Sequence, residues 1–257
     1  MKILVCVKQV PETEASIVID TSNKGIQRDL INEWKMNRYD EAAVEEALQI
    51  KEAFPNTTID IISVGPPRAE IAIKRAMGMG ADGGIHIVTD NEKYSDPFAI
   101  ASWIAVYAKN YDLILAGVMS EDAMQGLVGP LIAENVALPC ATAVIYEQLW
   151  PKKKRFYLER EIEGGFREQI ELDLPAVLTV QTGINQPRYP SLSNLLRANK
   201  TELVTIDAAK LEYPSERLGM IRLAYPRKLR EGLFFKGSQQ AKAEQLLQLL
   251  EEKSFIR

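Results

Sequence analysis

Up to about Thr142, short blocks of consecutive apolar residues alternate with longer blocks in which apolar residues recur every three or four positions. The consecutive blocks predict buried strands at Lys2–Val7, Thr58–Val64, Gly84–Val88 and Asp112–Ala116. The periodic blocks predict helices at Asp40–Phe54, Arg68–Met77, Pro97–Lys109 and Met124–Val136. This alternation predicts the α/β fold class, with a doubly wound, mostly parallel sheet that carries helices on both faces.

Beyond Thr142, apolar and polar residues alternate singly, which is typical of antiparallel strands. Two such stretches, Phe156–Ile162 and Arg167–Leu172, flank Gly164-Gly165 and predict an added hairpin. A short apolar block then predicts a buried strand at Ala176–Gln181.

The last part of the chain differs in pattern from the rest. From Thr201 onward it predicts extended segments that end in a helix at Ser238–Glu252. We therefore expect an α/β domain at residues 1–200, which includes the hairpin, and a C-terminal arm at residues 201–257.

Composition removes several classes of protein. The net charge of −4 gives no indication of nucleic-acid binding, and no apolar run is long enough to cross a membrane. With one histidine and no Cys-x-x-Cys motif, a zinc or iron–sulfur site is not expected. The two cysteines, Cys6 and Cys140, lie in apolar, strand-like contexts, which favours a reduced, cytoplasmic protein.

The first candidate for chemistry is the loop after the fourth predicted strand, which runs from Gly117 to Pro130. Ligands of parallel sheets bind beyond the carboxyl ends of the strands, and the N–H groups at a helix start can receive a phosphate. Two other interpretations stay open. Gly126 and Gly129 can be turn and packing glycines, and Asp122 can be the N-cap of the next helix.

The second candidate follows the strand at Ala176–Gln181. Arg188 stands between a proline and a tyrosine, and its planar guanidinium suits a phosphate or a ring, or caps neighbouring carbonyls. By pattern alone Leu192 is a core residue. The acidic residues Glu41, Glu45 and Glu46 on the first helix predict a solvated face.

Several blocks in this region resemble the signature of the electron transfer flavoprotein beta subunit in order and spacing. They are Arg160–Gly165, Leu174–Thr179, Asn185–Tyr189 and Leu192–Lys200, together with Met36–Ala47, Gly65-Pro66 and Ala76–Ile87 nearer the N-terminus. The resemblance implies an electron carrier subunit, not an enzyme, that pairs with an alpha subunit. FAD would lie mainly on the alpha subunit.

The resemblance also implies an adenine nucleotide on this chain, which is AMP in ordinary members and a second FAD in electron-bifurcating members. Its contacts would be Cys6, Asn37, Tyr39, Asp40, Val64, Gly117, Asp122, Gln125, Gly126, Leu127, Val128 and Gly129. Val128-Gly129-Pro130 and Lys8-Gln9-Val10-Pro11 are similar to the bifurcating branch, whereas Tyr39-Asp40-Glu41 is similar to the ordinary branch.

For partners, the resemblance implies docking through Leu192 and Arg188. The donor would be a dehydrogenase of the acyl-CoA type, as in fatty acid beta-oxidation, and the acceptor a membrane or iron–sulfur oxidoreductase. A bifurcating beta subunit is one alternative function. A stand-alone enzyme or sensor that binds ATP or AMP on a similar α/β fold is another.

Overall fold

The structure is a computed structural model that describes residues 1–12, 17–27, 30–31, 33–89, 96–212, 217–226 and 232–256. Outside the described residues lie 13–16, 28–29 and 32, in the stretch before Asn37. Residues 213–216, 227–231 and 257 of the expected arm also lie outside them. The chain divides into two compact units, Met1–Ile221 and Arg222–Arg257. The division falls later in the chain than the expected boundary at residue 200.

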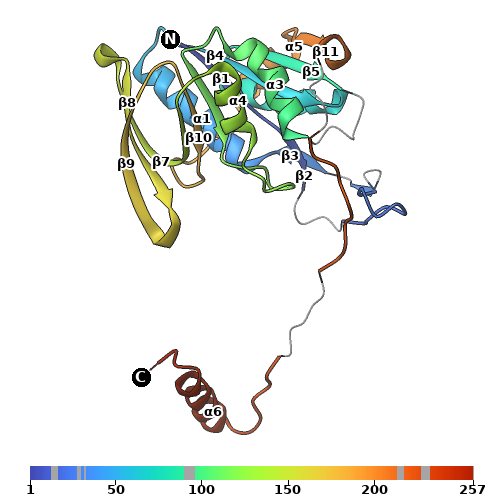
Figure 1. Cartoon of the computed structure of the whole chain (residues 1–257), viewed down its shortest axis with the longest axis vertical. Coiled ribbons are helices and arrows are strands. Elements are labelled where there is room, and N and C mark those ends of the chain that lie inside the picture. The colour runs from blue at the N-terminus through green and yellow to red at the C-terminus, as the bar shows by residue number, and fades with distance from the viewer. Residues whose placement is uncertain are drawn as a thin grey trace. The chain divides into compact units, whose positions relative to one another are not determined.

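The first unit is built on a nine-stranded mixed sheet, which confirms the predicted fold class (Figure 1). In spatial order its strands are β11 (Val204–Asp207), β5 (Gly83–Val88), β4 (Thr58–Gly65), β1 (Lys2–Cys6), β6 (Leu113–Gly117), β10 (Ala176–Val180), β7 (Cys140–Trp150), β8 (Arg155–Ile162) and β9 (Phe166–Asp173). Strands from β11 to β7 pair in parallel, and β7, β8 and β9 pair antiparallel.

Helices cover both faces of this sheet, because alternate strand residues supply two separate cores. One core packs under α1 (Arg38–Ala53) and α2 (Glu70–Met79), and the other under α3 (Pro97–Ala108) and α4 (Val128–Val136). The short helix α5 (Leu192–Lys200) packs on α2. Single 3-10 turns lie at Pro67–Ala69, Pro151–Lys153, Glu163–Gly165 and Ala208–Lys210.

Three elements differ from the sequence prediction. The helix α4 begins at Val128 and not at Met124, because Met124 and Gly126 adopt positive φ values of 51° and 64° that no α-helix can contain. Between Val7 and Asp40, where the sequence predicts neither a strand nor a helix, lies a small antiparallel pair, β2 (Gln9–Pro11) with β3 (Trp34–Met36). Strand β11 extends the sheet with residues that the sequence assigned to the arm.

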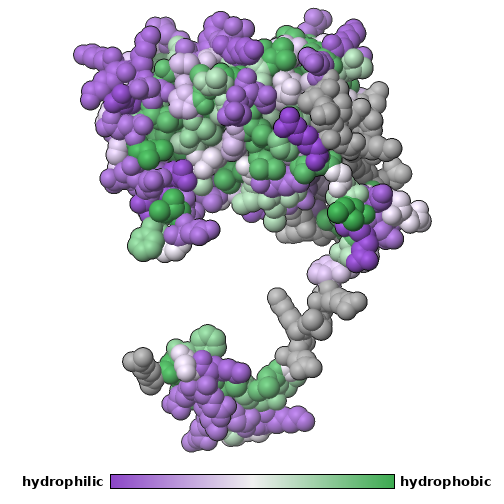
Figure 2. Space-filling model, in the orientation of Figure 1, coloured by the Kyte–Doolittle hydropathy of each residue, from purple (hydrophilic) through white to green (hydrophobic). Residues whose placement is uncertain are grey.

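The second unit contains α6 (Gln239–Glu252), close to the predicted Ser238–Glu252. Ser238 caps this helix by accepting a hydrogen bond from the amide of Ala241. No described residue of α6 is buried, and Leu246 and Leu247 are both exposed. Figure 2 shows apolar side chains next to hydrophilic ones on the visible face of this unit.

Candidate functional site

The strand order reverses between β1 and β6. From β1 the chain proceeds outward to β4 and β5, whereas β6 leads to the other half of the sheet, through β10 and β7 (Figure 1). In open α/β sheets this switch point is where the connections leave in opposite directions and open a crevice beyond the strand ends. Two of the predicted contact residues, Cys6 and Gly117, end β1 and β6 at this edge.

Asp40 ties together the two strand ends at the switch point. Its Oδ2 accepts a hydrogen bond at 2.8 Å from the amide of Lys8, two residues after the end of β1. Its Oδ1 accepts one at 3.0 Å from the amide of Gly117, the last residue of β6. Burial raises the pKa of the Asp40 carboxyl to about 7, although the N–H donors oppose that shift. From the first turn of α1, the Asp40 carboxyl therefore holds the ends of β1 and β6 at a fixed spacing.

Asn37 holds the loop of residues 118–127 in place. Its side-chain amide donates to the carbonyl of Met119 at 2.9 Å, and its Oδ1 accepts from the amide of Glu121 at 3.1 Å. Asn37 is almost fully buried, so these two bonds are shielded from water. Asn37 and Asp40 thus fix the backbone at this edge through hydrogen bonds to its amide and carbonyl groups.

Asp122 is engaged by a lysine. The ammonium of Lys8 lies 2.6 and 2.8 Å from the two carboxylate oxygens of Asp122 and 3.2 Å from the hydroxyl of Ser120. The N-cap position of α4 is occupied by Leu127, so the interpretation of Asp122 as that N-cap is wrong. The sequence named Lys8 only within the Lys8–Pro11 block and not as a charged group of this edge, where it lies two residues after the end of β1.

The start of α4 has free backbone donors. Leu127 occupies the N-cap position, and its apolar side chain cannot accept from the first amides of the helix. These amides belong to Val128 and Gly129, because Pro130 has no N–H. Gly129 is buried against Thr179 of β10, and a Cβ at this position would lie 2.3 Å from Thr179 Cγ2. Gly126 adopts a φ of 64° in the turn just before the helix. The structural roles expected for these two glycines are both present, and they bring the helix start close to the sheet edge.

The other predicted contacts surround this edge. Cys6 and Val64 lie at the carboxyl ends of the neighbouring strands β1 and β4. Burial raises the pKa of the Cys6 thiol far above its usual range, and the nearby Asp40 carboxylate adds to the effect, so the thiol stays protonated. Tyr39 is half-buried, and Gln125 is exposed.

The second candidate segment, residues 185–200, is fastened to α1. Arg188 donates through Nε and Nη2 to the two carboxylate oxygens of Glu45, both at 2.8 Å, and through Nη1 to Glu52. Burial alone would raise the pKa of Glu45, but the hydrogen bonds from Arg188 hold it below its usual value. The guanidinium of Arg188 is therefore engaged within the chain.

A second acidic residue of α1 is also buried. Glu46 accepts a 2.7 Å hydrogen bond from the side-chain amide of Asn185, and burial raises the pKa of its carboxyl against the opposing effects of Asn185 and of Glu147 on β7. Burial, together with the neighbouring charge of Glu46, raises the pKa of Glu147 to about 8. The predicted solvated face at Glu45 and Glu46 is thus wrong, because both side chains bind residues from distant parts of the chain.

The helix α5 has one side held and one side exposed. Leu195 packs over Gly78 of α2, where a Cβ would lie only 2.5 Å from Leu195 Cδ2. Lys74 of α2 donates to the carbonyl of Ala198 at 2.8 Å and to that of Thr201, so it caps the C-terminal end of α5. Leu192, in the first turn of α5, is 75% exposed, which differs from the core position that its pattern alone predicted.

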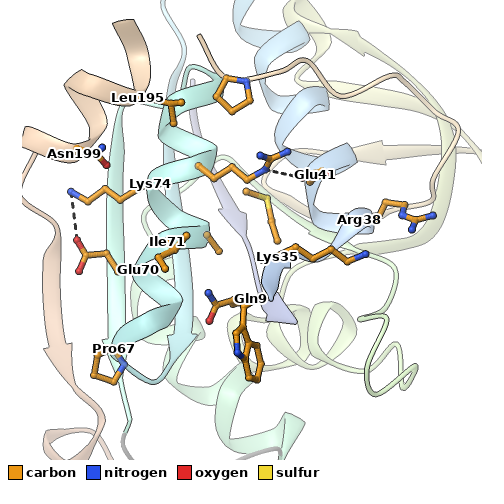
Figure 3. A pocket seen from close by; sticks show the side chains of 15 residues that line it. Gln9, Lys35, Arg38, Glu41, Pro67, Glu70, Ile71, Lys74, Leu195 and Asn199 are labelled. Atoms are coloured by element: carbon orange, nitrogen blue, oxygen red, sulfur yellow. Dashed lines mark hydrogen bonds and ion pairs between the residues drawn. The ribbon is translucent and has the colours of Figure 1, made fainter. Parts of the chain in front are cut away.

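A groove of about 840 Å³ runs beside α5 (Figure 3). It is lined by Gln9, Trp34, Lys35, Met36, Arg38, Glu41, Pro67, Glu70, Ile71, Ala72, Lys74, Arg75, Pro190, Leu195 and Asn199. Ion pairs lie along it, Arg75 with Glu41 at 2.9 Å and Lys74 with Glu70 at 3.7 Å. This groove connects α2 with the β2–β3 pair, and its lining residues Met36 and Arg38 flank the predicted contact Asn37.

Neither membrane nor metal features occur in the described part of the chain. None of its helices combines the length and apolar character needed to cross a bilayer. Within the same residues, no three acidic, histidine or cysteine side chains group in a way that could hold a metal ion.

A parallel sheet whose strand order reverses, with a helix start beside the switch point, is shared by α/β proteins that hold phosphate-bearing ligands. Comparison with known proteins makes the class specific. The family model described as electron transfer flavoprotein domain matches residues 30–211. The chain therefore belongs to the electron transfer flavoprotein family, and full-length relatives identify it as a beta subunit.

Three relatives illustrate the match. The chain is 34% identical to electron transfer flavoprotein subunit beta of Bacillus subtilis (strain 168), with 100% of both chains aligned. It is 32% identical to the protein of the same name from Thermoanaerobacterium thermosaccharolyticum, again over 100% of both. It is also 32% identical to the mitochondrial subunit beta of Arabidopsis thaliana, over 91% of this chain and 92% of the relative.

Proposed function

We propose that this chain pairs with an alpha subunit and carries electrons between a dehydrogenase of the acyl-CoA type and a downstream oxidoreductase. The redox chemistry belongs to FAD, held mainly by the alpha subunit, and this chain supplies position and binding surfaces. The relatives named subunit beta support the pairing. The observation that carries the proposal is the Asp40 frame, which fixes the ends of β1 and β6 beside the open start of α4.

In this proposal the crevice holds an adenine nucleotide with its phosphate at the start of α4. The free N–H groups and the helix dipole favour an anion there. The half-buried Tyr39 and the strand ends at Cys6 and Val64 would line the nucleoside. AMP is favoured, because Met124 stands where bifurcating relatives carry an acidic residue.

A glycine substitution tests the position of the phosphate. Gly126→Asp places a carboxylate at the helix start, and we expect the folded protein to lose its bound nucleotide. Gly183→Asp is the matched control, because Gly183 also has a positive φ, 91°, but nothing lies within 4 Å of the position of its Cβ. Nucleotide released by denaturation is identified and counted by chromatography. A folded Gly126→Asp protein that keeps its nucleotide rules out this placement.

The same chromatography separates the ordinary from the bifurcating function. Val128-Gly129-Pro130 and Lys8-Gln9-Val10-Pro11 keep a second FAD as the alternative to AMP. One FAD and one AMP per heterodimer supports the ordinary carrier. Two FAD molecules per heterodimer would establish the bifurcating alternative.

We further propose that the unit Arg222–Arg257 is an arm that packs on the alpha subunit. Its exposed apolar residues include Leu233, Phe234, Leu246, Leu247 and Phe255. Burying such side chains favours association, since each large apolar side chain contributes about 1.5–3 kcal/mol when fully buried. A chain that ends at Ile221 is expected to fold but to copurify poorly with the alpha subunit. Equal recovery of heterodimer from both chains would contradict this role.

A further inference from the structure

Lys8 joins the two halves of the sheet at the switch point. Its backbone follows β1, where its amide donates to Asp40 at 2.8 Å. Its ammonium reaches the loop of residues 118–127 after β6, where it lies 2.6 Å from Asp122 Oδ1 and 3.2 Å from the hydroxyl of Ser120. A positive charge therefore bridges the segments that follow β1 and β6, at the edge where open α/β sheets bind their ligands.

The backbone of Lys8 is fixed, whereas its side chain can exchange partners. Asp40, which holds the Lys8 amide, is only 6% exposed. The side chains of Lys8 and Asp122 are 39% and 33% exposed, and ion pairs so accessible to water are weak. A phosphate monoester carries about two negative charges at neutral pH, so it attracts an ammonium more strongly than one carboxylate does.

The same loop carries a second carboxylate, which has cations of its own. Glu121 lies 3.7 Å from the ammonium of Lys35 and 3.5 Å from the guanidinium of Arg38. Two carboxylates in consecutive positions would repel a phosphate, and these two cations offset the charge of Glu121. The charge of Asp122 is offset by Lys8, so Asp122 and an arriving phosphate require the same ammonium.

We infer that Lys8 binds the phosphate of the nucleotide and that Asp122 competes with this phosphate for the ammonium. The inference rests on the proposed function, which places an adenine nucleotide at the switch point. A carboxylate has no hydrogen to donate to a phosphate oxygen, so Asp122 cannot replace the lysine as a ligand. Asp122 is then a competitor of the nucleotide and not the contact that the family resemblance implies.

Equilibrium dialysis of the heterodimer, freed of its adenine nucleotide, tests this inference with two probes, AMP and adenosine, which lacks the phosphate. We expect Lys8→Met to bind AMP about tenfold more weakly than the parent, and Lys8→Arg to keep most of the affinity because it keeps the charge. Asp122→Asn should bind AMP about threefold more tightly, because the competing charge is gone. The affinity for adenosine should stay the same in all three variants.

Lys51→Met is the matched control for the loss of a lysine. Lys51 pairs with Asp82 at 2.5 Å, and the two side chains are 27% and 38% exposed, close to the values of Lys8 and Asp122. Lys51 lies in the last turn of α1, whereas the predicted contacts Asn37 and Asp40 lie at its start. The affinity of Lys51→Met for AMP should therefore equal that of the parent.

The outcomes separate the inference from the function on which it rests. If the parent heterodimer does not bind AMP, the proposed nucleotide is wrong and the inference fails with it. If the parent binds AMP but Lys8→Met matches Lys51→Met, or weakens AMP and adenosine equally, the inference fails while the proposed function stands. Asp122→Asn gives the last comparison. If it binds AMP no more tightly than the parent, or binds adenosine more weakly, Asp122 supports the site or contacts the ribose, and the competition is refuted.

Discussion

The pair between Arg188 and Glu45 gives the sharpest prediction for stability. Arg188→Met removes both side-chain hydrogen bonds to Glu45 and the contact with Glu52, and it keeps most of the apolar length of the side chain. The backbone amide of residue 188 still donates to Glu45. The side chain of Glu45 is only 5% exposed, so its carboxylate would be left buried without its cation. We therefore expect a large loss from this single substitution.

The expected magnitude follows from the burial of the two partners. Breaking a buried ion pair by removing one partner costs about 3–5 kcal/mol. Arg188 is itself 35% exposed, and water can partly replace it, which favours the lower end of that range. A loss of about 3 kcal/mol corresponds to roughly a hundredfold change in the unfolding equilibrium.

Urea unfolding of the parent and of three variants measures this loss. The double variant Arg188→Met/Glu45→Met removes both charges and is expected to recover most of the stability, because no unpaired carboxylate remains buried. Arg167→Met is the surface control, since Arg167 is 68% exposed and lies 3.5 Å from Glu159. A double variant that is no more stable than Arg188→Met would refute the reasoning, and so would an Arg188→Met loss equal to that of the control.

Two further predictions concern the core around the site. Glu147→Gln should be more stable than the parent at pH 8.5 but not at pH 5. The pKa of Glu147 is raised to about 8, so its protonation stabilises the parent fully only below the ordinary carboxyl pKa. This stability is lost as pH rises through 8. Equal urea midpoints of parent and variant at pH 8.5 would contradict the raised pKa of Glu147. Gly129→Ala should cost about 1–3 kcal/mol, because the new Cβ meets Thr179 Cγ2 at 2.3 Å. Adding Thr179→Ser removes that methyl group, keeps the hydroxyl that accepts from Ala143, and should restore thermal stability.

Local pattern predicted most of the fold but missed elements that depend on distant partners. The strands and helices of the α/β part and the hairpin follow from apolar periodicity and the Gly164-Gly165 turn, and all are present. Strand β11 has only four residues and gains its place by pairing with β5, so the sequence pattern placed it in the arm. The start of α4 was missed because Met124 adopts a positive φ that non-glycine residues seldom adopt.

The same reason explains what was missed in the candidate site. Asp40 and Asn37 were predicted from a motif, but their role as holders of backbone depends on residues 117–121. Glu45 and Glu46 looked solvated because their partners, Arg188 and Asn185, lie more than a hundred residues later in the chain. No window of local sequence contains such a pair.

The acidic residues of helix α1 hold two different parts of the molecule. Asp40 in its first turn holds the ends of β1 and β6. Glu45, Glu46 and Glu52 in the following turns hold the segment that ends in α5. At about 1.5 Å per residue, Asp40 and Glu52 are roughly 18 Å apart along one continuous rod. The switch point and α5 therefore share one support, so that a change that tilts or frays α1 disturbs both together. Hydrogen exchange along α1 in an Asp40→Asn protein would reveal how far such a disturbance travels.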